Sequence, residues 1–169
     1  AMFALLLLHA AASLWLQTAA PFIDAGLAGS ILLFAVNTLR LQFHRRRKLS
    51  DVTLDYWRLG MASLIACVSV WLAARFWPAW ADSDAYPMLL GVLFIGGFAV
   101  SVVSGMLYKI VPFLAWFHLQ SQLQARAGSI PTMKDMIAER WMRWQFRLHF
   151  AACALLLVAV LWPRLSIVA

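Results

Sequence analysis

The chain has 169 residues, of which 64% are hydrophobic and only 12% are charged, and its mean hydropathy is +0.80. Soluble domains contain about 45–50% apolar and about 25% charged residues, and a chain of this size cannot bury such an apolar excess. The composition excludes soluble enzymes and secreted modules and predicts an integral membrane protein. The net charge of +7 does not indicate a nucleic-acid partner, because the basic residues flank apolar runs, where they act as topology signals.

Five continuous apolar runs predict five transmembrane helices, since about 20 helical residues cross the hydrocarbon core. In chain order they cover residues 1–17, 22–40, 57–77, 87–109 and 144–162, and the fourth run can continue to residue 120. An additional cytoplasmic interfacial helix is predicted over residues 130–144, where Met133, Met136, Ile137, Trp141 and Trp144 recur at helical spacing. The sequence thus predicts an all-α, polytopic transmembrane bundle of about five spans, forming a single domain over residues 1–169.

The basic residues fall into two of the connections between these spans. One group is Arg40, Arg45, Arg46, Arg47, Lys48 and Arg58, and the other is Arg126, Lys134, Arg140, Arg143 and Arg147. The alternate connections contain Asp24, Asp82 and Asp84 and little basic charge beyond Arg75. Because cytoplasmic loops carry an excess of Lys and Arg, we expect both basic connections in the cytoplasm, with the N-terminus inside and the C-terminus outside.

Small residues in the fourth run predict a surface for helix packing. Gly97, Ser101 and Gly105 follow one another at intervals of four residues and form one flat stripe along a helix. Small residues at this spacing let the backbones of two membrane helices approach closely. We expect the stripe to contact another helix of this chain or of a partner.

Tyr108, Lys109 and Pro112 mark the predicted cytoplasmic edge of the fourth span. The 32 residues from 87 to 118 would measure about 48 Å as a straight helix, against a hydrocarbon core of about 30 Å. We therefore expect the helix to leave the core here with a bend near Pro112. Two readings of Tyr108 and Lys109 are open, anchoring at the headgroups or proton movement. An anionic group, such as a heme propionate or a lipid phosphate, would be drawn to this edge.

Residues 104–118 read SGMLYKIVPFLAWFH, and this run resembles a glycine–tyrosine–proline element of the heme–copper oxidase subunit I superfamily. It is similar more closely to bacterial membrane proteins described as subunit I-like, in which such a run lies near the C-terminal end of about twelve helices. The basic run at 45–48 and the residues 130–133 also fit that group. The resemblance implies a location in the bacterial inner membrane and a chain that is the C-terminal part, or a partner, of a larger assembly of helices or subunits.

The chain departs from that superfamily in its ligands. In the oxidases, a His-x-His pair about fifteen residues before the shared element binds the two hemes, whereas residues 89–93 of this chain contain no histidine. No copper site is evident either. A heme in a bundle takes axial ligands from facing helices, commonly histidines, so the candidates are His9 and His149, with His118 as a third. The alternative for each is a single polar residue bonded to a neighbouring helix, and Cys67 and Cys153 are expected to be buried free thiols.

Two functions are consistent with these residues. The first is a heme-associated redox membrane protein that lacks the oxidase catalytic ligands in this chain and would engage in electron transfer. The second is a non-redox helical membrane subunit for assembly, scaffolding or small-ligand transport. The sequence names no catalytic residue, and it contains none of the phosphate-binding, hydrolase or redox motifs of soluble enzymes.

Overall fold

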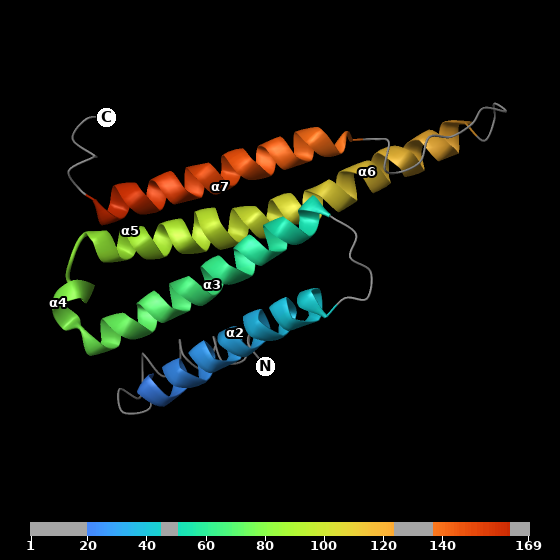
Figure 1. Ribbon diagram of the computed structural model, residues 1–169. Helices are drawn as coiled ribbons and strands as arrows, with labels where there is room; N and C mark the ends of the chain where they lie inside the picture. Colours follow the sequence, from blue (N-terminus) through green and yellow to red (C-terminus); the bar gives the residue numbers. More distant parts are fainter. Residues whose placement is uncertain (1–19, 45–50, 124–136, 163–169) are drawn as a thin grey trace.

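The computed structural model describes residues 20–44, 51–123 and 137–162 (Figure 1). The described residues form helices and turns and contain no strand, which confirms the all-α class for this part of the chain. The elements are α2 (Ala20–Phe43), α3 (Val52–Phe76), α4 (Pro78–Ala81), α5 (Ala85–Gly91), η1 (Val92–Val100), α6 (Ser101–Leu123) and α7 (Glu139–Leu161).

Four segments of the described chain are long and apolar enough to cross a membrane: Phe22–Phe43, Val52–Phe76, Ala85–Gln120 and Glu139–Leu161. They correspond to the second to fifth predicted spans, and the predicted span over residues 1–17 lies outside the described residues. Many large apolar side chains are exposed along them, including Phe22 at 80% and Leu155 at 70%. Exposure of this kind is expected where lipid, not water, surrounds the helices.

The third span begins earlier than the hydropathy predicted, at Val52 and not near residue 57. The cause is a helix cap, because the carboxylate of Asp51 accepts a hydrogen bond of 3.0 Å from the backbone N–H of Thr53. Such a side chain satisfies one of the backbone donors that the first helical turn leaves unpaired. The helix therefore extends through polar residues that a hydropathy window assigns to the loop.

The prediction of a separate interfacial helix over residues 130–144 is wrong for residues 139–144. Residues 139–144 form the first turns of α7, which runs without interruption to Leu161, and residues 130–136 lie outside the described residues. Glu139 and Arg143 lie one turn apart and form an ion pair, which stabilises the start of the helix. The two tryptophans assigned to the interfacial helix, Trp141 and Trp144, thus belong to the fifth span.

The fourth span is a single long helix that continues past the predicted exit. Pro112 lies inside α6 and does not end it, because the helix extends to Leu123. The interruption of α-helical geometry occurs instead at η1, where nine residues adopt π-helical hydrogen bonding. In a π segment each backbone N–H bonds the carbonyl five residues earlier, and such segments are rare insertions within α-helices. Figure 1 shows the C-terminal part of α6 projecting beyond the ends of α3 and α7.

The helices lie side by side, with α3 between α2 and the α5–η1–α6 rod and with α7 on the other side of that rod (Figure 1). The core lies around α3, where Ala35, Met61 and Leu64 are buried against partly buried side chains of α2, η1 and α6. Because successive spans run in opposite directions, the end of α2, the start of α3, the end of α6 and the start of α7 share one end of the bundle.

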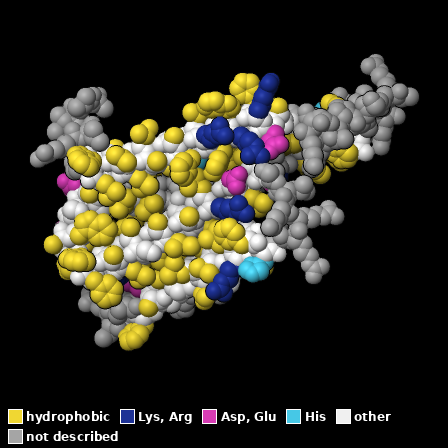
Figure 2. Space-filling view, viewed as in Figure 1, with side chains coloured by type: hydrophobic (Ala, Val, Ile, Leu, Met, Phe, Trp, Pro, Cys, Tyr) yellow, Lys and Arg dark blue, Asp and Glu magenta, His cyan; other side chains and the backbone are white. Residues whose placement is uncertain are grey.

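The two ends of the bundle differ in charge. Arg75 is the one described Lys or Arg at the end where α2 begins and α3 finishes, and it pairs with the buried carboxylate of Asp24 across these helices. The other described basic residues lie at the opposite end, which we call the basic end (Figure 2). They are Arg40, Arg58, Lys109, Arg140, Arg143 and Arg147. The topology thus brings the described members of the two basic connections to the same end of the bundle.

Candidate functional site: the polar cluster around His149

A hydrogen bond between α6 and α7 forms the centre of the candidate site. The Ser101 hydroxyl lies 2.8 Å from Nε2 of His149, and Ser101 is completely buried. One turn further along α7, Sγ of Cys153 lies 3.8 Å from the same ring nitrogen. The side chains of Ser101, His149 and Cys153 thus meet inside the bundle. Ser101 is the first residue of α6, and His149 lies near the middle of α7.

Tyr56 of α3 covers this centre on the side of the basic end. Tyr56 is 1% exposed, and its ring centroid lies 5.6 Å from that of His149, 5.8 Å from that of Tyr108 and 5.0 Å from that of Phe146. The Phe146 contact is edge to face, one of the favourable geometries for aromatic pairs. Tyr56 therefore joins α3, α6 and α7 through ring contacts.

A second interhelical hydrogen bond lies between this centre and the basic end. The hydroxyl of Tyr108 on α6 donates to Oε1 of Gln145 on α7. Tyr108 is seven residues from Ser101 along the helix, which corresponds to about 10 Å. The two bonds therefore hold α6 and α7 together at two separate levels, and we call the residues that make or cover them the His149 cluster. Its members are Tyr56, Ser101, Tyr108, Gln145, His149 and Cys153.

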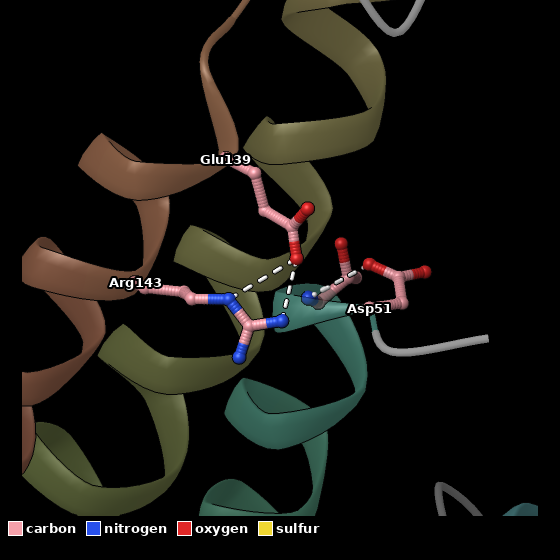
Figure 3. A network of polar contacts seen from close by, with 4 residues as sticks. Asp51, Glu139 and Arg143 are labelled. Carbon is pink, nitrogen blue, oxygen red and sulfur yellow. Dashed lines mark hydrogen bonds and ion pairs between the residues drawn. The ribbon is translucent and has the colours of Figure 1, made fainter. Parts of the chain in front are cut away.

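Ion pairs surround the cluster at the basic end. Nζ of Lys109 lies 3.8 Å from the Asp51 carboxylate and so connects α6 with the cap of α3. Nearby, the guanidinium of Arg143 binds Glu139 through two nitrogens, at 2.5 and 3.1 Å (Figure 3). All four side chains are at least one-third exposed, so each pair contributes little to stability. They place both signs of charge where the helices would reach the membrane surface.

The predicted packing stripe faces α3. A methyl group added at Gly97 would lie 2.6 Å from Cβ of Ser63, and one added at Gly105 would lie 3.2 Å from Cβ of Tyr56. On the opposing helix, a methyl group at Gly60 would lie 3.6 Å from Cβ of Ser101. The stripe therefore brings the backbones of α3 and of the η1–α6 segment into close approach, which places Tyr56 beside the His149 cluster.

Two other histidines, His118 and His44, do not reach this site. His118 is exposed and lies 17 residues beyond Ser101, about 26 Å along α6, while His9 lies outside the described residues. His44 is exposed at the end of α2, where its Nδ1 lies 2.9 Å from the carbonyl oxygen of Arg40. His149 and His118 therefore cannot bind the same iron. Pro112 is buried within α6, and Cys67 and Cys153 are free thiols of which Cys153 is buried.

The cavity that adjoins the His149 cluster is small. Cys153 lines this cavity, which has a volume of about 110 Å³. Its other lining groups are mainly apolar and come from α3, η1 and α7, including Leu59, Leu93 and Leu157. Sites for cofactors and ligands of drug size usually have about 300–1,000 Å³. In addition, Nε2 of His149, the atom that faces the bundle interior, already contacts Ser101 and Cys153. A heme bound by this histidine would require both space and a second ligand from elsewhere.

Sequence reasoning missed Tyr56, Gln145 and Ser63, although each decides part of the site. Tyr56 lies one residue before the predicted third span, Gln145 is the second residue of the predicted fifth span, and Ser63 is one of several small residues in an apolar run. A helical projection of α3 with Tyr56, Gly60 and Ser63 on one face could have indicated the surface that meets the glycine stripe.

Comparison of the chain with known protein families, curated proteins and solved structures finds no match. The function is therefore inferred from the chemistry and geometry of the residues themselves.

Proposed function

We propose that the chain is a non-redox helical membrane subunit that serves the assembly of a larger membrane complex. The observation that carries the proposal is the use of the cluster's polar groups. These groups bond α6 to α7, through Ser101 with His149 and through Tyr108 with Gln145. The adjoining cavity of about 110 Å³ is smaller than a usual ligand site. Polar side chains used in this way fasten membrane helices to one another.

The weak apolar burial of α7 supports this role for the cluster. Only 6% of the most apolar window of α7 is buried inside the bundle, compared with 28% for α3. Hydrocarbon tails are as apolar as leucine, so apolar contact with lipid does not drive α7 toward the other helices. The two polar bonds and the contacts of Tyr56 then select the position and register of α7. A scaffold needs such fixed helices, since partners recognise a defined surface.

The proposed location is the bacterial inner membrane, with the basic end in the cytoplasm. The grouping of the described cations at one end of the bundle supports this orientation, since the K/R bias of short loops sets topology. The resemblance of residues 104–118 to subunit I-like proteins supports the bacterial membrane and the larger assembly. The proposed partners are other transmembrane helices or subunits and the lipid bilayer.

A heme-associated redox role is the second candidate, and the observation that favours it is the depth of His149. An imidazole within a membrane span is a functional hypothesis by default, and the sequence predicts His9 within another span that starts on the same side. Bis-histidine ligation by His9 and His149 would bring a heme that stores and transfers one electron. His149 would then have to give up its contact with Ser101.

Absorption spectroscopy distinguishes the two candidates. Protein purified from its native membrane in mild detergent is expected to show no heme absorption band and to migrate on a native gel in a complex larger than the 19.0 kDa chain. A Soret band that shifts on reduction and disappears in His149→Phe would overturn the non-redox proposal in favour of the second candidate. Migration as a monomer would overturn the assembly role.

A further inference from the structure

A groove at the basic end is separate from the His149 cluster. It has a volume of about 460 Å³ and is lined by residues of α2, α3 and α6. Gln42 of α2, Thr53 and Trp57 of α3, and Met106, Lys109 and Ile110 of α6 line it. The volume is within the usual range for ligand sites, about 300–1,000 Å³.

The groove has two chemically different parts. Trp57, Met106 and Ile110 make its wall apolar, whereas Lys109 and Gln42 bring polar groups to the same cavity. The Lys109 side chain is 60% exposed, and its ammonium lies 3.8 Å from one carboxylate oxygen of Asp51. An ammonium has three N–H donors, so it can bind a second oxygen anion while it contacts Asp51.

The position of the groove selects a lipid over a soluble anion. Its apolar wall runs along α6 within the Ala85–Gln120 span, which is the region that acyl chains would contact. Arg40 and Arg58, at the same end of the bundle, add positive charge near the membrane surface. We propose that this groove binds an acidic phospholipid, with its phosphate on Lys109 and the upper part of an acyl chain against Trp57, Met106 and Ile110. Basic residues at a membrane surface attract anionic lipids in this manner.

The test compares lipids that differ only in headgroup. Short-chain phosphatidylglycerol, short-chain phosphatidylcholine and inorganic phosphate are titrated separately into the full-length protein in a neutral detergent. The midpoint of thermal unfolding is followed, and native mass spectrometry counts bound lipids. We expect phosphatidylglycerol to bind more tightly than phosphatidylcholine and inorganic phosphate to have no effect. Equal binding of the two lipids, or stabilisation by phosphate alone at the same concentration, would overturn the proposal.

Three variants locate the site. Lys109→Gln is expected to weaken phosphatidylglycerol binding about fivefold, the equivalent of one surface cation, and to leave phosphatidylcholine binding unchanged. Lys109→Arg retains the positive charge and should retain the preference for phosphatidylglycerol over phosphatidylcholine. This variant therefore controls for effects of substitution at position 109 that do not depend on charge. Arg140→Gln is the matched control, since Arg140 is exposed on α7 at the same end but outside the groove. An equal loss in Arg140→Gln would show surface attraction without a site and would refute the groove.

Discussion

Ser101 and His149 are separated by 48 residues in the chain, yet their side chains form a hydrogen bond of 2.8 Å between α6 and α7. Ser101 also lies on the glycine stripe, 3.6 Å from the place that a Cβ of Gly60 on α3 would occupy. The same buried serine therefore lies at the meeting point of α3, α6 and α7. Its small side chain permits the approach of α3, and its hydroxyl bonds α7.

The first prediction concerns the energy of this hydrogen bond. Ser101→Ala and His149→Phe should each lower stability, and their effects should not add, because each removes the same interaction. Hydrogen bonds between membrane helices contribute about 0.6 kcal/mol on average and up to about 1.7 kcal/mol. A double-mutant cycle measured by reversible unfolding in mixed micelles gives this coupling energy. Ser69→Ala is the control, since the Ser69 hydroxyl bonds the carbonyl of Ile65 in its own helix. Strict additivity of the two substitutions would contradict the assignment.

The second prediction tests the close approach of α3 and η1. Gly97→Ala should destabilise the bundle by about 1–3 kcal/mol through overpacking, because the new methyl group would lie 2.6 Å from Cβ of Ser63. Gly96→Ala should be neutral or stabilising, since no atom lies within 4 Å of its added methyl group and alanine favours helix over glycine. Thermal unfolding of the two variants measures the difference.

A compensating substitution makes this test specific. Ser63→Gly removes the Cβ that Gly97→Ala would meet, so the double variant should recover most of the lost stability. If the double variant is as unstable as Gly97→Ala alone, the clash with Ser63 is not the cause.

The third prediction concerns the ion pair at the opposite end of the bundle. Asp24 is 5% exposed and binds Arg75 across α2 and α3. Arg75→Gln should cost about 1–3 kcal/mol, because it leaves a buried carboxylate without this cation. The double variant Asp24→Asn/Arg75→Gln should be more stable than Arg75→Gln alone, since the second substitution also removes the buried negative charge. Chemical unfolding measures both, and a double variant less stable than the single one would refute this account.

The fourth prediction concerns the orientation of the bundle in the membrane. Asp84→Cys should react with a membrane-impermeant maleimide on intact cells, whereas Arg140→Cys should react only after the membrane is opened. Asp84 and Arg140 are exposed and lie at opposite ends of the bundle. The unsubstituted chain is the background control, because its Cys153 is buried and its Cys67 is partly buried. The reverse labelling pattern would place the basic end outside the cell.

The sequence by itself determined the class of the protein and the sides on which its charges lie. Residues 22–43 and 52–76 form helices because their apolar side chains favour lipid and their backbone groups bond within the segment. Arg40 and Arg140 reach the same end because each successive span reverses direction. These properties depend on composition and on order along the chain, which a single sequence contains. The start of α3 escaped prediction because a single local hydrogen bond, from Thr53 to Asp51, extends the helix into a polar stretch.

Only the tertiary structure decided which polar residues form a site. The sequence offers both His149 and His118 as candidate ligands, yet His149 bonds Ser101 inside the bundle, whereas His118 is exposed near the end of α6. The pairing of Gly97 with Ser63 likewise depends on how far α3 is shifted and rotated against η1. Hydrophobicity does not specify that register in a membrane. An apolar helix surface contacts lipid as favourably as it contacts another helix, whichever way the helix is rotated about its axis. Close contacts between small residues and hydrogen bonds between distant helices select it, and these exist only after the helices have packed.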